Sequence, residues 1–391
     1  MVAEVRGFSF HVIQLFVGQS CYTSAYYLTP YIMKKFILLG IGVLVGSLCH
    51  IYACTGISFQ SQDGAYIVAR TIEWAATPTP AFYVVTPRGH SITSYTPTGT
   101  NGLSFTSRYG SVGLATQQAE FIAEGINEAG LSAGLFFFSR YGDYGPYHKE
   151  NSSQYICDLQ VVSWLLGSFA TIDEVKKGME SVKVVSVNPD PTSALHWRIA
   201  DASGRQVVME ITHGGEVHFF ENTVGVLTNS PGFEWQLTNL NNYIGLHTGY
   251  VSARQIGNIS LHSFGAGAGL HGLPGDVTPP SRFVRAYFYT ATAAQPKTAL
   301  SAITQSFHIL NNFDIPLGLE HVRKSDIPDM PSTTQWTTAT DISHRRIYYR
   351  TAYNSRIRCI DLKTINFKKV KYQVHPLDLV KEEMIEMISI P

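Results

Sequence analysis

The chain has 391 residues, of which 45% are hydrophobic and 15% are charged. Lys plus Arg and Asp plus Glu both number 29, so the balance favours neither a nucleic-acid partner nor an acidic solvated tail. The composition is that of an ordinary globular protein and excludes a fibrous or disordered chain.

An export signal is indicated near the N-terminus. Lys34 and Lys35 precede a long apolar stretch, and Ala53 supplies a small residue directly before Cys54. This pattern is typical of a secretory signal peptide over residues 33–53, and the apolar stretch is too short for a good membrane span. We therefore expect a periplasmic or secreted protein, with an uncleaved N-terminal anchor as the alternative.

The rest of the chain divides simply. Residues 1–32 fit no export pattern, and we interpret them as an upstream extension ahead of the true start at Met33. Residues 54–391 contain no internal repeat and no linker, which predicts a single domain.

The elements of residues 54–391 predict a layered α+β domain. Residues 54–74 read as a β-hairpin that turns at Asp63-Gly64. Strands are expected at 81–86 and 111–118, followed by a turn at Asn127-Glu128 and a strand within 124–138. A helix is predicted over 154–182, then an antiparallel meander of short strands over 194–231, a glycine-rich loop at 265–275, a second helix at 297–312, and strands at 333–339, 345–353 and 356–362.

Five cysteines occur, at positions 21, 49, 54, 157 and 359. Removal of residues 1–53 leaves three of these cysteines, an odd number. An exported protein could pair Cys157 with Cys359, but nothing in their spacing requires it. Cys54 is the cysteine that we expect to stay free.

The position of Cys54 suggests a chemical role. Cleavage after Ala53 would make Cys54 the first residue and give its thiol a free α-amine on the same residue. That amine has a reference pKa near 8 and can accept the thiol proton, directly or through a water. One residue would then supply both the nucleophile and the base for attack on an amide or an ester.

Other uses of Cys54 remain open. A lipoprotein cleavage would acylate its thiol and amine, although the bulky Tyr52 fits that signal poorly. A papain-like Cys–His pair is a further alternative, but the sequence around Cys54 lacks the local signature of that family.

Several segments together resemble the choloylglycine hydrolase family, which includes bile salt hydrolases and penicillin V acylases. The resemblance begins at CTGISFQSQDGAYIVARTIEW (54–74) and continues through EGINEAGLSAGL, SALHWRIAD, GVLTNSPGFEWQLTNLNNYIGL, LPGDVTPPSRFVRA, FHILNN and TQWTTATD. It covers nearly all of residues 54–391 in the expected order. It implies a four-layer αββα N-terminal-nucleophile hydrolase fold with two packed antiparallel sheets between helix layers.

The resemblance also implies roles for five residues. Cys54 is the expected nucleophile, Arg70 the arginine beside it that lowers the thiol pKa, and Arg282 the second arginine of the site. Asn229 matches the side-chain donor of the oxyanion hole. Glu73 stands where many members carry Asp, so the carboxylate that holds the terminal amine is longer by one methylene.

Aromatic residues are expected to shape the substrate pocket. Phe136 stands where bile salt hydrolases tend to carry Asn and penicillin V acylases Tyr, and the family uses the backbone N–H of this position in the oxyanion hole. Phe136, Phe137 and Phe138 with Trp74 would favour an apolar or aromatic acyl group, although such residues more often fill a core.

The hairpin geometry sets a condition on this site. A two-residue turn at Asp63-Gly64 would place Glu73 opposite Cys54 and point Arg70 to the other face of the sheet. Both side chains could then reach Cys54 only across a bulge between Arg70 and Glu73, which we predict.

Two further patterns have simpler interpretations. Gly267, Gly269 and Gly272 match a dinucleotide-binding pattern, but Pro274 follows and the strand-then-helix context is missing, so a flexible loop near the active site is favoured. A Gly-Gly turn is flanked by His213, Glu216 and His218. Histidine and glutamate can bind metals, but no zinc motif is present. We interpret these as surface residues, so no metal site is predicted.

The function implied by the resemblance is hydrolysis of a non-peptide C–N amide bond without a metal or organic cofactor. Conjugated bile salts are the first expected substrates, followed by penicillin V and then N-acyl homoserine lactones. Related enzymes often form tetramers, so a homo-oligomer is expected. An inactive exported lipoprotein or binding protein with the same fold is the alternative from another class.

Overall fold

The computed structural model describes residues 53–74, 79–188, 190, 193–320 and 332–390. Residues His50–Pro391 form one compact unit. The predicted signal segment and the predicted extension before it lie outside the described residues, except for Ala53. None of the described helices is both long and apolar enough to cross a membrane.

Two antiparallel sheets form the centre of this unit. The first, sheet A, has five strands in the order β1 (Cys54–Gln60), β2 (Tyr66–Glu73), β16 (Thr334–Asp341), β17 (Arg346–Thr351) and β18 (Asn354–Asp361). The second, sheet B, has eight strands in the order β13 (Glu216–Glu221), β12 (Gln206–Thr212), β11 (Leu195–Ala200), β8 (Ser132–Phe137), β7 (Ile122–Asn127), β6 (Ser111–Thr116), β3 (Ala81–Thr86) and β19 (Gln373–Pro376).

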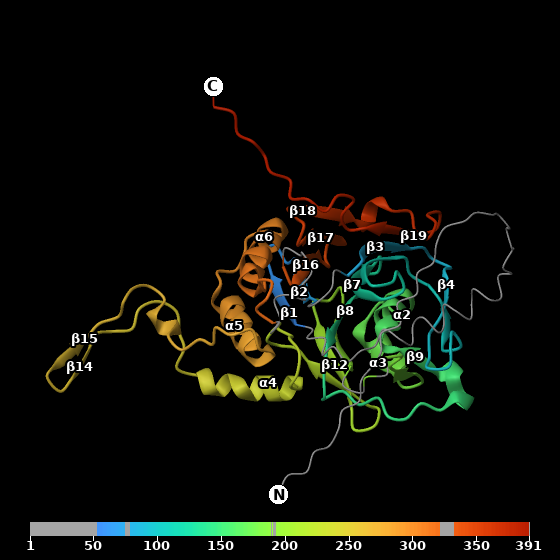
Figure 1. Ribbon diagram of the computed structural model, residues 1–391, viewed down its shortest axis with the longest axis horizontal. Helices are drawn as coiled ribbons and strands as arrows, with labels where there is room; N and C mark the ends of the chain where they lie inside the picture. The colour runs from blue at the N-terminus through green and yellow to red at the C-terminus, as the bar shows by residue number, and fades with distance from the viewer. Residues whose placement is uncertain (1–52, 75–78, 189, 191–192, 321–331, 391) are drawn as a thin grey trace, which may run out of the picture. The chain divides into compact units, whose positions relative to one another are not determined.

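Helices cover the outer face of each sheet (Figure 1). On sheet A, α5 (Pro279–Thr292) contacts β1, and α6 (Ala299–Leu310) contacts β1, β2 and β16. On sheet B, α2 (Val161–Ser168) contacts β6, β7 and β8. The predicted α+β class and its αββα layers are therefore confirmed. Because both faces of the central strands are covered, strands such as β2 and β11 are buried along almost their whole length.

The predicted helix over 154–182 is wrong in its extent. The structure has a short strand, β9 (Tyr155–Cys157), paired in parallel with β10 (Lys183–Val185), and two helices between them, α2 and α3 (Ile172–Met179). Thr171 starts the second helix, because its side chain accepts a hydrogen bond from the backbone N–H of Glu174.

Two helices were not predicted. These are α4 (Phe233–Asn239) and α5, whose first two residues are Pro279 and Pro280. Proline is favoured in the first turn of a helix, where its missing N–H has no partner to lose. Two small hairpins lie outside the two sheets. One pairs β4 (Ser91–Thr93) with β5 (Ser104–Thr106), and the other pairs β14 (Arg254–Ile256) with β15 (Ile259–Leu261) in an arm that extends away from the sheets (Figure 1).

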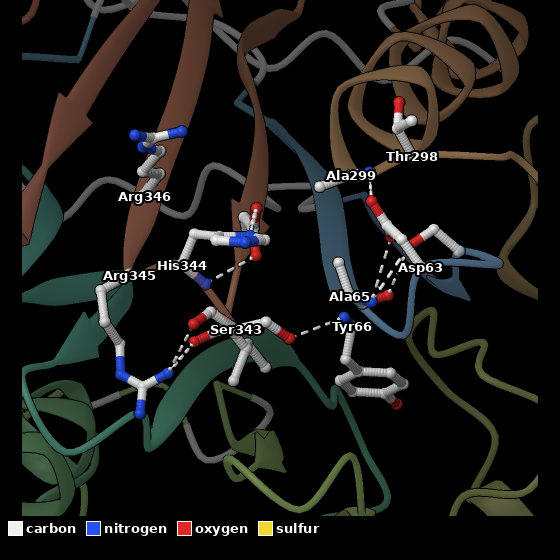
Figure 2. Close-up of polar contacts among 12 residues, drawn as sticks. Asp63, Ala65, Tyr66, Thr298, Ala299, Ser343, His344, Arg345 and Arg346 are labelled. Atoms are coloured by element: carbon white, nitrogen blue, oxygen red, sulfur yellow. Dashed lines mark hydrogen bonds and ion pairs between the residues drawn. The ribbon is translucent and has the colours of Figure 1, made fainter.

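The β1–β2 turn differs from the predicted two-residue turn by one residue. Gln60 pairs with Tyr66, and the backbone N–H of Ser61 donates to the Ala65 carbonyl, so three residues form the loop and Gly64 adopts φ +85°. Asp63 fixes the loop, because its Oδ2 accepts the N–H of Ala299 at the start of α6 (Figure 2).

The longer turn changes which side chains share a face. Cys54 pairs with Ile72, and Gly56 pairs with Arg70, so Arg70 lies on the same face of the hairpin as Cys54. The predicted bulge between Arg70 and Glu73 is absent from the β1–β2 ladder. The irregularity lies instead on the partner strand β16, between Thr334 and Trp336.

Candidate active site

Cys54 is the first residue of β1 and is buried at the inner face of sheet A. It lies at one side of a cavity whose apolar lining includes Ile72, Trp74, Leu135, Phe137, Leu159 and Leu195. Polar groups from Thr116, Gln117, Asp158, Ser186, Asn188 and Ser193 complete the lining. A thiol next to a mostly apolar cavity with a few convergent polar groups is the arrangement expected of a small-molecule site.

Arg70 extends from sheet A into the space between the sheets. Its guanidinium lies 4.1 Å from the centre of the Phe136 ring and 3.9 Å from the Glu124 carboxylate. The same carboxylate accepts from Arg198 on β11 at 2.5 Å. Gly56, opposite Arg70, leaves room for the Phe136 ring, because a Cβ at position 56 would lie 2.8 Å from that ring. The expected arginine near Cys54 is thus held by a buried charge network that joins both sheets.

Asn229 and Arg282 meet at the backbone of Cys54. The Cys54 N–H donates to Asn229 Oδ1 at 2.9 Å, and Arg282 Nη2 donates to the same oxygen at 2.7 Å. Arg282 Nη1 also donates to the Cys54 carbonyl and to Thr55 Oγ1. With Asn229 Oδ1 occupied by two donors, its Nδ2 group is directed to Phe137, whose carbonyl oxygen it contacts at 2.9 Å.

The backbone N–H beside Cys54 belongs to Phe137. It donates a hydrogen bond to the Cys54 sulfur, which favours the thiolate. The sequence analysis expected the backbone N–H of Phe136 in the oxyanion hole, whereas the N–H that contacts the Cys54 sulfur is that of Phe137. Because side chains alternate along β8, Phe136 points between the sheets against Arg70, while Phe137 points into the cavity.

Phe138 does not enter the cavity either. It is buried and stacks on His196 at 4.4 Å between ring centres. Of the four predicted pocket aromatics, Phe137 and Trp74 therefore line the cavity, whereas Phe136 and Phe138 pack elsewhere in the core.

Burial and charge act in opposite directions on Cys54. Burial raises the pKa of its thiol, the Arg70 and Arg282 guanidiniums lower that pKa, and the nearby Glu73 carboxylate raises it. The two cations are therefore placed to offset part of the cost of forming a thiolate in a buried position.

Glu73 lies on the other face of β2, toward the helices. Its backbone N–H donates to the Ala53 carbonyl, and its Oε1 accepts from Thr334 Oγ1 at 3.3 Å. Burial raises the pKa of Glu73 to about 8, although Arg282 lowers it. In this chain, which keeps Ala53 linked to Cys54, the hydrogen bond of the Cys54 nitrogen goes to Asn229 and not to Glu73.

A buried polar pair behind Asn229 was missed by the sequence analysis. His196 Nε2 contacts the Thr228 carbonyl at 3.0 Å, and its Nδ1 lies 3.2 Å from Glu210 Oε1. The same Glu210 oxygen accepts the N–H of Phe233, the first residue of α4. The sequence offered two signals for this pair. One is the charged residue in the mostly apolar strand QVVMEIT, and the other is the histidine in the strand LHWRIA.

Asp158 is a second missed residue. It is buried at the cavity wall, and burial raises its pKa to about 7. Cys157 and Cys359, the other two cysteines among the described residues, are both free, the first buried and the second exposed. Gly267, Gly269 and Gly272 lie in the segment between β15 and α5, as the loop interpretation predicts. None of them lines the cavity beside Cys54, so the expected position of this loop near the active site is not found.

Comparison with known proteins places this geometry in a family. A bile salt hydrolase/transferase from Clostridium perfringens is 32% identical over 323 residues, which cover 80% of this chain and 93% of that protein. A penicillin V acylase from Pectobacterium atrosepticum is 28% identical, over 72% of this chain and 73% of that protein. The crystal structure of a variant of conjugated bile acid hydrolase from Clostridium perfringens superposes with a TM-score of 0.74 at 28% identity, covering 86% of this chain and all of that one.

The family model described as linear amide C–N hydrolases, choloylglycine hydrolase family, matches residues 54–378. That match begins at Cys54 and includes the strands of both sheets and the residues that surround the thiol. The protein is therefore a hydrolase of linear amide C–N bonds and belongs to the choloylglycine hydrolase family.

Proposed function

We propose that this protein is an exported amidohydrolase in which Cys54 is an N-terminal nucleophile. The observation that carries the proposal is the environment of Cys54. Its sulfur accepts the Phe137 N–H, its nitrogen is held by Asn229, and its side chain borders a mostly apolar cavity.

The proposed reaction begins after cleavage between Ala53 and Cys54. The freed α-amine takes the thiol proton, and the thiolate attacks the acyl carbon of the substrate amide. The Phe137 N–H and Asn229 Nδ2 would stabilise the negative charge on the oxygen of the tetrahedral intermediate. Collapse of that intermediate breaks the C–N bond, and the leaving amine takes the proton held by the α-ammonium group.

Water completes the proposed cycle. The same α-amine accepts a proton from a water molecule as the water attacks the thioester, and the free acid leaves with regeneration of the Cys54 thiol. The positive charges of Arg70 and Arg282 lower the pKa of the Cys54 thiol, so their proposed role is to favour the thiolate.

Conjugated bile salts are the substrates that we propose first. The Clostridium perfringens relative is named a bile salt hydrolase/transferase, and the apolar side of the cavity suits a large apolar acyl group. Penicillin V is the second proposal, because the Pectobacterium atrosepticum relative is named a penicillin V acylase. N-acyl homoserine lactones are the third.

A hydrolysis panel with taurocholate, glycocholate and penicillin V tests the substrate class. Cys54→Ser tests the nucleophile, and Cys359→Ser is the matched control, since Cys359 is exposed on β18 and outside the cavity. We expect Cys54→Ser to lose turnover while Cys359→Ser keeps it. Unchanged turnover in a folded Cys54→Ser protein would exclude the mechanism.

Mass spectrometry of the mature protein tests export and processing. A chain that begins with an unmodified Cys54 supports a periplasmic or secreted enzyme. An acylated Cys54 would block both the thiol and the amine, and would support the alternative of an inactive surface lipoprotein.

A further inference from the structure

Three metal-ligand side chains gather at the turn between β12 and β13. Thr212 pairs with Glu216 across the hairpin, so His213, Gly214 and Gly215 form the loop. Glu216 and His218 share one face of β13, because side chains alternate along a strand. One donor atom from each of His213, Glu216 and His218 lies within 4.8 Å of the other two.

The backbone and a neighbouring hydroxyl hold His213 in place. His213 has φ +50°, a left-handed conformation that is uncommon for a residue with a side chain. Its Nδ1 contacts Thr212 Oγ1 at 2.9 Å. When Nδ1 donates to this hydroxyl, Nε2 carries the free lone pair that a metal needs, which is how second-shell partners orient metal-binding histidines.

His218 offers a nitrogen that lacks a hydrogen-bond partner. Its ring packs against Phe220, and its Nε2 atom is buried without a hydrogen bond to any described residue. Glu216 Oε2 lies 3.7 Å from this atom. A buried polar atom left without a partner is unfavourable, and a bound cation would satisfy it.

We propose that His213, Glu216 and His218 bind one divalent transition-metal ion, with Zn²⁺ as the best match. Two imidazoles and one carboxylate suit Zn²⁺, whereas Mg²⁺ and Ca²⁺ prefer oxygen ligands throughout. Ligand atoms around tetrahedral zinc lie about 3.4 Å apart, given bonds of about 2.0–2.1 Å. The exposed Glu216 and His213 side chains need only small rotations to reach that spacing from their present separation.

The site is separate from the proposed chemistry. None of the three side chains lines the Cys54 cavity, and β13 is the edge strand of sheet B. The bound ion joins the turn to this edge strand, so its effect is to stabilise the hairpin rather than to supply a catalytic step.

Calorimetric titration of the metal-free, untagged protein with ZnCl₂ tests the proposal. We expect one equivalent to bind and the melting temperature to rise. His218→Gln and His213→Asn should each weaken binding by at least about tenfold, as should Thr212→Val through loss of the Nδ1 contact. Asn is chosen at position 213 because it tolerates the left-handed backbone. His262→Ala, an exposed histidine on the distant arm, is the control and should bind Zn²⁺ normally.

Cys54 is the competing zinc ligand and must be separated from the site. Binding in a Cys54→Ser background should be unchanged, and Co²⁺ bound to the protein should show visible bands without a thiolate charge-transfer band. Melting curves of the metal-free variants must match the wild type. Binding that is lost with Cys54→Ser, or kept in both histidine variants, would overturn the proposal.

Discussion

The backbone nitrogen of Cys54 donates a hydrogen bond to the side-chain oxygen of Asn229, 175 residues further along the chain, at 2.9 Å. This bond fixes the orientation of the Asn229 amide, so that Nδ2 lies on the side of Phe137. One residue therefore positions the first residue of β1 and, in the proposed mechanism, offers the second donor for an oxyanion.

Asn229→Ala should lower kcat by about 10²–10³-fold, because one oxyanion donor is lost from a preorganised site. The assay is steady-state hydrolysis of whichever amide substrate the panel identifies. Asn242→Ala, at an exposed position after α4, is the control and should keep full activity. An unchanged kcat for Asn229→Ala would remove Asn229 from the proposed oxyanion hole.

The start of the chain should control activity. A protein that begins at Cys54 has a free α-amine, whereas a protein that begins at Ala53 has an amide nitrogen in its place. Loss of a general base costs about 10²–10⁴-fold in rate, so the longer protein should be slower by that factor. Equal melting temperatures would show that both chains are folded, and equal rates would contradict an N-terminal base.

The sequence was sufficient to predict a layered α+β fold, because β-branched and apolar runs bounded by glycine and asparagine mark most of the strands. It was insufficient for the register of β1 and β2. The Asp63-Gly64 pair indicated a two-residue turn, but Asp63 also accepts the N–H of Ala299, and this contact with a distant helix goes with a three-residue loop. A difference of one residue decides the face on which Arg70 lies.

The same limit applies to the phenylalanine run. Phe136, Phe137 and Phe138 are equivalent in composition, and only the alternation of β8 within sheet B determines which one points into the cavity. His196 and Glu210 lie next to the site and contact each other. They come together through strand pairing and through α4, a helix that the sequence analysis had not predicted.

Glu124→Gln should destabilise the protein strongly. Glu124 is the carboxylate that separates Arg70 from Arg198 between the two sheets, and all three side chains are buried. Removing one partner from a buried ion pair costs about 3–5 kcal/mol of unfolding free energy. Urea-induced unfolding at neutral pH measures this loss.

Asp173→Asn provides the matched surface comparison. Asp173 pairs with Arg205 at 2.7 Å, but its side chain is 80% exposed. An exposed ion pair contributes about 0–1 kcal/mol, so this variant should stay close to the wild type. Similar losses for Glu124→Gln and Asp173→Asn would contradict a structural role for the buried network.

Glu73 should make stability depend on pH in a protein that keeps Ala53 before Cys54. Burial raises the pKa of Glu73 from 4.5 in the unfolded chain to about 8 in the fold. Between these values the folded state holds a proton that the unfolded state has released. Glu73 therefore stabilises the fold fully below about pH 4.5, and this contribution is lost as the pH rises through about 8.

The test compares Glu73→Gln with the wild type by urea unfolding from pH 5 to pH 8. Glutamine does not titrate, so the difference in unfolding free energy should shift in favour of the variant by up to about 1.4 kcal/mol per pH unit. Asp158, whose pKa burial raises to about 7, titrates in both proteins and cancels in this difference. In the chain that begins at Cys54, an ammonium group near Glu73 would lower its pKa and flatten the slope. A difference that stays constant with pH in the longer chain would show that Glu73 is ionised throughout, and that a cation compensates it in the fold.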